Sequence, residues 1–277
     1  MQGSSVKQLI FIAGTLALTA VLYFAPRNSK KIPESNKISE SKKDFDFDEL
    51  LSFQEKNLTP DELQKAENWK SELMQPASRV NLSFYDSLAG LWDSKKMLAL
   101  SAHYFELKAG KDNSEKSFLN AAYRFFDAYK NALDSMVKVS MAEKSIKYYS
   151  EVLKLNPKNM DAKTDLGALY AEATSDPMKG ILMLREVVAE NPNHENAQLN
   201  LGFLSVKSKQ YEKALERFDN VLRINPENRQ VYLYKAQVYE QMNNVGKAVE
   251  NYQQFLKLSG NKEVNSQIEQ RIRELKK

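Results

Sequence analysis

The chain has 277 residues, of which 42% are hydrophobic, and this composition excludes a wholly disordered protein. Its 40 basic and 36 acidic residues give a formal charge of +4 and are mixed along the sequence, which excludes the concentrated basic surface of a nucleic-acid-binding protein. The absence of cysteine excludes disulfides, thiolate metal sites and thiol catalysis, and it leaves the cellular compartment open. Helix-forming residues fill the stretches between Gly and Pro, so the chain is predicted to be all-α.

The first apolar stretch lies at the N-terminus. No charged residue occurs between Lys7 and Arg27, and the apolar centre from Leu9 to Phe24 is long enough to cross a bilayer as a helix. We therefore predict a transmembrane anchor over residues 1–26. A cleaved secretory signal is the alternative, although Pro26 is unfavourable directly after a cleavage site.

The charges that flank this stretch predict its orientation, because Lys and Arg resist translocation across an energised membrane. Lys7 precedes the stretch, and the basic residues that follow it are Arg27, Lys30, Lys31, Lys37, Lys42 and Lys43. This bias favours an inner-membrane protein whose large C-terminal part faces the cytoplasm. The acidic residues Glu34 and Glu40 weaken the bias, so a periplasmic orientation stays open.

A polar segment and an acidic-aromatic segment come next. Residues 27–44 are rich in Ser, Lys, Asn and Glu and show no hydrophobic period, which predicts a flexible linker. Aromatic and acidic residues alternate from Asp44 to Glu49. We interpret this as the start of a helix that packs Leu50, Leu51 and Phe53 against the body, with a docking motif for a partner as the alternative.

Residues 45–114 are predicted to form a helical region with a divergent repeat-like hairpin. Thr59 followed by Pro60 and two acidic residues is a strong helix start, and that helix should end before Pro76. Two further helices are predicted near 81–92 and 94–109, the second ending at Gly110. In that second helix Leu98, Ala102 and Phe105 share one face.

A fixed period dominates the C-terminal half. Asn-Pro pairs stand at 156–157, 191–192 and 225–226, and Ser259-Gly260 falls where a fourth pair would be. A period near 34 residues is typical of a solenoid of helix-turn-helix units, in which each unit buries its apolar face against its neighbours. The sequence therefore predicts a surface for binding rather than a catalytic cavity.

The residues within each period resemble the tetratricopeptide repeat family. That family places a Leu-Gly pair and a Tyr on the first helix, and Ala and an aromatic residue on the second. The resemblance implies a right-handed superhelix with repeats at 160–194, 195–228 and 229–260, and with a divergent repeat at 115–159 whose first helix is lengthened. The residues that imply close packing between helices are Gly167, Tyr170, Gly202, Ala214, Phe218, Ala236, Tyr239, Ala248 and Tyr252.

The C-terminal segment 261–277 is predicted to be a capping helix. One apolar stripe runs along an otherwise charged helix, through Val264, Ile268, Ile272 and Leu275. A partner-binding tail is the alternative. The layout as a whole also resembles that of single-anchor tetratricopeptide proteins of Bacteroidetes-type bacteria, on the phrase from Asp176 to Val188.

The sequence offers no candidate catalytic residue. His103 lies within a predicted helix and His194 lies between repeats, and neither has a second ligand or a nucleophile at useful spacing. We interpret both as structural or solvent-facing histidines. The expectation is a protein that is not an enzyme and that holds no metal and no cofactor.

The resemblance also implies a binding face, because tetratricopeptide arrays usually bind peptides along the concave side lined by the first helices. The groove candidates are Asn196, Leu199, Phe203, Val206, Lys207, Gln230, Leu233, Gln237, Glu240 and Gln241, and the preceding repeat adds Asp161, Thr164, Ala168, Ala171 and Glu172. The alternative is that Leu199 and Phe203 pack on the adjacent repeat. Groove positions such as Leu199 and Gln230 lack the basic groups that a chaperone carboxylate clamp would need.

These observations predict a single-pass membrane protein whose helical array assembles protein partners at the membrane. One alternative is a periplasm-facing, chaperone-like module of a translocon, secretion or cytochrome-assembly system. Another is a self-assembling protein that forms homo-oligomers through its end repeat. The identity of the partner does not follow from the sequence.

Overall fold

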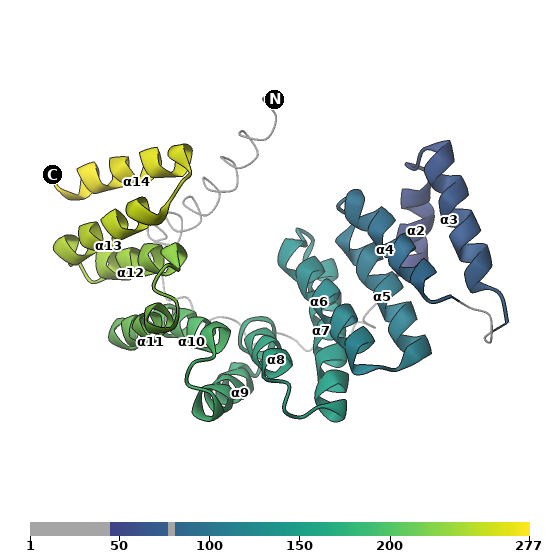
Figure 1. Cartoon of the computed structure of the whole chain (residues 1–277), viewed down its shortest axis with the longest axis horizontal. Helices are drawn as coiled ribbons and strands as arrows, with labels where there is room; N and C mark the ends of the chain where they lie inside the picture. Colours follow the sequence, from purple (N-terminus) through teal and green to yellow (C-terminus); the bar gives the residue numbers. More distant parts are fainter. Residues whose placement is uncertain (1–44, 77–80) are drawn as a thin grey trace, which may run out of the picture. The chain divides into compact units, whose positions relative to one another are not determined.

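The computed structural model describes residues 45–76 and 81–277, and all regular structure within these ranges is α-helical (Figure 1). The N-terminal part contains α2 (Phe47–Glu55), α3 (Pro60–Leu73), α4 (Ser83–Ser94), α5 (Leu98–Asp112), α6 (Glu115–Asn131) and α7 (Ser135–Leu155). The C-terminal part contains α8 (Met160–Ala173), α9 (Pro177–Glu190), α10 (Glu195–Lys207), α11 (Tyr211–Ile224), α12 (Arg229–Gln241), α13 (Val245–Leu258) and α14 (Lys262–Leu275). The all-α prediction is confirmed for this part of the chain.

Helices α4 to α13 form five consecutive helix pairs, and each pair packs against the pair that follows (Figure 1). In this article the first helices are α4, α6, α8, α10 and α12, and the second helices are α5, α7, α9, α11 and α13. Residues 160–258 contain three pairs whose helices each have 13 or 14 residues. The predicted solenoid of helix-turn-helix units is therefore present in the described residues.

The Asn-Pro pairs all end a second helix in the same way. The backbone N–H groups of Asn156, Asn191 and Asn225 donate to the carbonyl oxygens four residues earlier, at 2.8, 2.7 and 2.8 Å. The proline that follows has no N–H and disfavours a helical conformation of the asparagine. Helices α7, α9 and α11 therefore end at a fixed point, and this is why the structural period is visible in the sequence.

The α8/α9 pair is held at close range by two facing glycines. A methyl group at Gly180 would lie 2.2 Å from the carbonyl oxygen of Gly167 and 2.5 Å from the backbone nitrogen of Ala171. In the α10/α11 pair a methyl group at Gly202 would instead lie 2.6 Å from the ring of Phe218. Of the other predicted packing residues, Ala214, Ala236, Ala248 and Tyr252 are buried, and Tyr170 and Tyr239 are half-buried.

The extra length of the α6/α7 pair is distributed differently from the prediction. The first helix, α6, has 17 residues, but the second helix, α7, has 21 and takes most of the additional length. The Asp134 carboxylate accepts hydrogen bonds from the N–H groups of Met136 and Val137, so α7 begins directly after a three-residue connection. The prediction of a lengthened first helix is therefore incomplete, because an N-cap at Asp134 starts the second helix early.

At the N-terminal end, the acidic-aromatic segment forms α2, and its buried residue is Phe47. The Phe47 ring stacks on His103 of α5 at 4.8 Å and lies edge-on to Phe125 of α6 at 6.2 Å. Leu50 and Leu51 pack against the α3–α5 core as predicted, but Phe53 is 62% exposed and that part of the prediction is wrong. Phe47, Leu50 and Leu51 follow the helical spacing of one face, and Phe53 falls outside it.

Helix α3 agrees with its prediction, whereas α4 (Ser83–Ser94) and α5 (Leu98–Asp112) begin and end later than the predicted ranges 81–92 and 94–109. Thr59 and Glu62 form a reciprocal capping box at the start of α3, with Pro60 as its first residue. Helix α5 continues through Gly110 and ends at Asn113, which takes the left-handed conformation at φ 50°. The prediction that Gly110 ends this helix is wrong, because Asn113 supplies the positive-φ cap instead.

A partly buried ion pair joins α5 to α7. The Lys144 ammonium lies 2.7 and 2.8 Å from the two Glu106 carboxylate oxygens, and the Tyr148 hydroxyl donates to one of them at 2.8 Å. Burial on its own would raise the pKa of Glu106, but His103 at 3.6 Å, the hydrogen bonds from Lys144 and Tyr148 and the Lys144 charge hold it at about 2. This carboxylate is ionised wherever the protein is folded near neutral pH.

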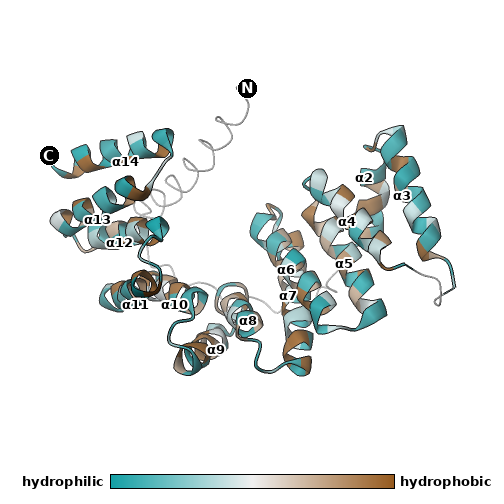
Figure 2. Ribbon diagram, viewed as in Figure 1, coloured by the Kyte–Doolittle hydropathy of each residue, from teal (hydrophilic) through white to brown (hydrophobic). Residues whose placement is uncertain are grey.

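The C-terminal helix α14 covers the last pair. Ile272 is buried, and Ile268 and Leu275 pack with it against a cluster that includes Tyr252 of α13. The remainder of α14 is mostly hydrophilic (Figure 2). Arg271 adds hydrogen bonds to Glu240 of α12, so α14 is attached to both helices of the pair.

The predicted anchor (1–26) and linker (27–44) lie outside the described residues. Within residues 45–76 and 81–277, no helix combines the length and the apolar character that crossing a bilayer requires.

Candidate functional site

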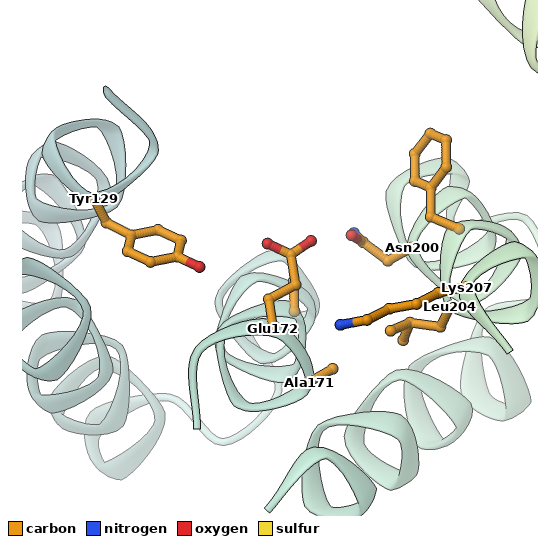
Figure 3. Close-up of a pocket in the computed structure, with 8 residues that line it drawn as sticks. Tyr129, Ala171, Glu172, Asn200, Leu204 and Lys207 are labelled. Atoms are coloured by element: carbon orange, nitrogen blue, oxygen red, sulfur yellow. The ribbon is translucent and has the colours of Figure 1, made fainter. Parts of the chain in front are cut away.

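A depression on the described surface spans three successive first helices, α6, α8 and α10. Its volume is about 280 Å³. Figure 3 shows the lining side chains converging from these helices, with Glu172 of α8 in the middle. The lining residues are Tyr129, Ala168, Ala171, Glu172, Asn200, Phe203, Leu204 and Lys207. We refer to this depression as the inner-face pocket.

Five of these residues were predicted as groove positions from the sequence, namely Ala168, Ala171, Glu172, Phe203 and Lys207. Tyr129, Asn200 and Leu204 were missed. Asn200 and Leu204 stand next to predicted positions on the same helix, so a wider window on α10 would have included them. Tyr129 lies on the lengthened helix α6, which does not follow the 34-residue register.

The aromatic wall of the pocket is formed by Phe203. Its ring lies edge-on to Tyr234 of α12, with 4.7 Å between ring centroids, and 5.6 Å from Phe218 of α11. The residue is nevertheless 39% exposed. Phe203 therefore contributes to packing between adjacent pairs and also presents apolar surface to a ligand.

The charged groups of the pocket are only partly paired. Lys130 lies 2.5 Å from the Glu172 carboxylate. In Figure 3 Lys207 extends from α10 toward Glu172, but its ammonium has no ion pair or side-chain hydrogen bond with any described residue. Burial raises the pKa of Tyr129, and the Glu172 charge adds to this, so the phenol is a neutral hydrogen-bond donor at neutral pH.

Asn200 adds an amide to this set. Its Nδ2 donates to the carbonyl oxygen of Asn196 at 2.9 Å, which fixes the side chain and leaves Oδ1 as an acceptor. The pocket thus offers an ammonium donor, a phenol donor, an amide acceptor and an aromatic edge within one depression. This combination suits a peptide segment that has both polar groups and an apolar side chain.

The remaining groove candidates divide into two groups. Asn196, Gln230, Gln237 and Gln241 are exposed, whereas Leu199 and Val206 are half-buried against the α11/α12 core, and of these two the packing alternative had named Leu199. Leu233 packs in the apolar cluster that α14 covers, and Glu240 accepts hydrogen bonds from Arg271 and from the Tyr252 hydroxyl. Leu233 and Glu240 are engaged by the C-terminal part of the chain rather than available to a ligand.

The upstream candidates Asp161 and Thr164 lie at the start of α8. Asp161 Oδ1 is 3.2 Å from Nε2 of His194, and Nδ1 of His194 accepts a hydrogen bond from the N–H of Ala197 at 3.3 Å. His194 is therefore the N-cap of α10. Thr164 is buried.

A partly buried carboxylate lies beside these residues. Burial raises the pKa of Asp165 to about 6, although the Tyr149 hydroxyl donates a hydrogen bond to it at 2.9 Å. Asp161 raises this pKa further and His194 lowers it. His103, the other histidine, stacks on Phe47. In the described ranges no cluster of His, Asp and Glu has the arrangement of a metal site.

The fold and the pocket together define a helical-repeat protein with an open inner face. Residues 205–254 match the family model described as tetratricopeptide repeat. The chain is similar to tetratricopeptide repeat proteins, and its described part is an all-helical array of that type.

Individual relatives are distant. A TPR repeat-containing protein of Methanocaldococcus jannaschii is 26% identical over 198 residues, covering 61% of this chain and 35% of the relative. The Hsp70-Hsp90 organizing protein of Triticum aestivum is 24% identical over 136 residues, covering 49% of this chain and 23% of the relative. The chain therefore spans about a third or less of the length of these relatives. Among solved structures, MamA of Desulfovibrio magneticus has a TM-score of 0.49 at 16% identity, covering 64% of this chain and 94% of that one.

Proposed function

We propose that this protein is a single-pass, membrane-anchored scaffold that holds a partner protein through a peptide segment seated in the inner-face pocket. The observation that carries the proposal is the combination of an unpaired ammonium at Lys207 and a partly exposed aromatic ring at Phe203 in one depression. The wheat relative is named for organising two other proteins, which agrees with a binding role. The proposal includes no catalytic step and no cofactor.

The chemistry of the pocket favours binding of protein over binding of a small metabolite. The depression is shallow and open, and its lining residues come from three separate first helices. An extended or helical segment can contact all three helices at once and bury Phe203, whereas a small molecule would leave most of this surface exposed. Lys207 then supplies a specific contact to an acceptor on the segment.

The membrane part of the proposal rests on the uncharged stretch between Lys7 and Arg27 and on the basic residues that follow it. We propose that the repeats face the cytoplasm. Because the chain contains no cysteine, Ser35→Cys in the linker gives a single labelling site. Protection of this cysteine from an impermeant maleimide in intact spheroplasts is the expected result. Labelling would instead place the repeats in the periplasm, as the chaperone-like alternative requires.

The pocket itself is tested by photo-crosslinking in native membranes. A photoreactive phenylalanine analogue at position 203 of the full chain should give a discrete protein adduct, which mass spectrometry then identifies. The same analogue at Leu182, an exposed residue of the second helix α9, is the matched control. Lys207→Glu should weaken the adduct formed from position 203. Equal adducts from both positions, or no effect of Lys207→Glu, would contradict binding at the inner-face pocket.

A further inference from the structure

The α6/α7 pair extends beyond the pair that follows it. Helices α6 and α7 cross where the Ser145 hydroxyl donates to the carbonyl oxygen of Ala122 at 3.0 Å. The corresponding crossing of α8 and α9 is where Gly167 faces Gly180. Helix α6 continues for nine residues after its crossing point at Ala122, whereas α8 continues for six residues after Gly167. Helix α7 begins ten residues before its crossing point at Ser145, whereas α9 begins three residues before Gly180. The overhang is about 4.5 Å in α6 and about 10 Å in α7 at 1.5 Å per residue.

This overhang, residues 129–139, is here named the hairpin tip, and it exposes large apolar side chains. Leu133 is 103% exposed, Met136 is 59% exposed and Val139 is 50% exposed. Within the described ranges, none of the three is among the buried or partly buried residues that form the core clusters. Folding alone does not account for three neighbouring apolar side chains in water, because their burial would be favourable.

The charges of the tip are compatible with an anionic surface. It carries Lys130, Lys138 and Asp134. The Asp134 carboxylate faces the backbone N–H groups at the start of α7, which offset its charge. Lys138 lies over the ring of Tyr129 at 5.3 Å and remains exposed. The tip therefore presents apolar side chains beside the exposed Lys138 ammonium, whereas Lys130 is paired with Glu172 of α8.

The chain enters the repeats close to this tip. Phe47 docks against Phe125 of α6, and Lys144 of α7 lies over its ring at 5.0 Å. Lys144 is about 12 Å from Met136 along α7, at 1.5 Å per residue. The predicted linker, residues 27–44, spans at most about 60 Å when extended. A chain anchored before residue 27 thus keeps the tip within reach of the bilayer.

We infer that the hairpin tip inserts Leu133, Met136 and Val139 into the surface of the membrane to which the chain is anchored. This inference rests on the proposed anchor. Three apolar side chains bind a membrane weakly by themselves, but tethering replaces a free encounter by an effective local concentration. Insertion prevents the helical array from rotating freely about its linker. It also turns the end of the inner-face pocket that contains Tyr129 toward the bilayer.

The experiment uses the full chain reconstituted into vesicles of phosphatidylcholine and phosphatidylglycerol. A nitrobenzoxadiazole probe is attached to Ser135→Cys, which leaves the three apolar side chains in place, and a doxyl-labelled lipid serves as quencher. Val245→Cys, an exposed position on α13, is the control. We expect about twofold or greater quenching at position 135 and none at 245. Leu133→Asp in the Ser135→Cys chain should remove the quenching, and because Leu133 is fully exposed the fold should tolerate it.

Each outcome decides between the proposals. A chain that co-floats with the vesicles but shows no quenching at position 135 overturns the tip inference and leaves the anchor intact, and the tip then belongs to a protein contact. A chain that does not co-float overturns both. Quenching that survives Leu133→Asp shows proximity without insertion and also overturns the inference.

Discussion

The close approach of α8 and α9 makes Gly180→Ala the sharpest test of the packing described above. Alanine is the usual residue of tetratricopeptide repeats at this position, so the resemblance alone predicts that the change is harmless. The structure predicts otherwise, because the new methyl group would lie 2.2 Å from the Gly167 carbonyl oxygen and 2.5 Å from the Ala171 nitrogen. Neither backbone atom can move without the helix that carries it, and relief requires α8 and α9 to separate by about 1 Å.

The expected magnitude follows from two opposing effects. Overpacking of this kind costs about 1–3 kcal/mol, and the value should lie at the upper end because the clash is with backbone. Alanine is more favourable than glycine within a helix by about 1 kcal/mol. The free energy of unfolding should therefore fall by about 2 kcal/mol.

Gly90→Ala is the matched control, because Gly90 lies within α4 and no heavy atom is within 4 Å of its added methyl group. This variant should be more stable than the parent chain by about 0.5–1 kcal/mol. Urea unfolding of the full chain in detergent, followed by circular dichroism, measures both variants, and hydrogen exchange of residues 160–190 localises the loss. Equal stabilities of the two alanine variants would refute the close contact.

Three further predictions concern partly buried polar groups. Glu106→Gln should lower the free energy of unfolding by about 2 kcal/mol, because it leaves Lys144 without its partner. The pKa of Glu106 in the folded protein is about 2, below its ordinary value, so the ionised carboxylate stabilises the fold above about pH 4.5. Acid titration of the parent should show this contribution disappear toward pH 2, and titration of the variant should not. Asp165→Asn should remove a pH dependence of the opposite sign. Burial raises the pKa of Asp165 to about 6, so the parent loses stability as the pH rises from about 4 to 6. Melting curves of the variant should lack that decline. His194→Ala should cost about 1 kcal/mol by removing the N-cap of α10, and His194→Asn should restore most of it; equal melting temperatures for the two would show that the cap is unimportant.

The features that the sequence predicted well are those that repeat locally. Asn-Pro pairs end helices through contacts within four residues, so their spacing reports the fold directly. Small residues at the crossing of two helices are visible for the same reason, as at Gly167. Thr59 and Glu62 form a cap within one turn of helix, and their pattern is equally explicit.

The features that were missed depend on contacts between residues distant in the sequence. Glu240 occupies a groove position in its own repeat, but Arg271, which lies outside the repeat pattern, binds it. Tyr129 enters the pocket only because α6 is longer than the other first helices. Phe47, rather than Phe53, is buried because three different helices provide its partners. A periodic pattern carries no information about such pairings.

The helix α14 has a consequence for how this protein can change in length. Its apolar residues are used against the last pair, and its outer surface is largely polar. A duplicated unit placed after α14 would contact the hydrophilic outer surface of this helix. A unit inserted before residue 261 would pack against the same apolar surface that α14 now covers. Longer versions of this array, natural or engineered, should therefore gain their additional units upstream of α14 and retain this helix as the cover of the last pair.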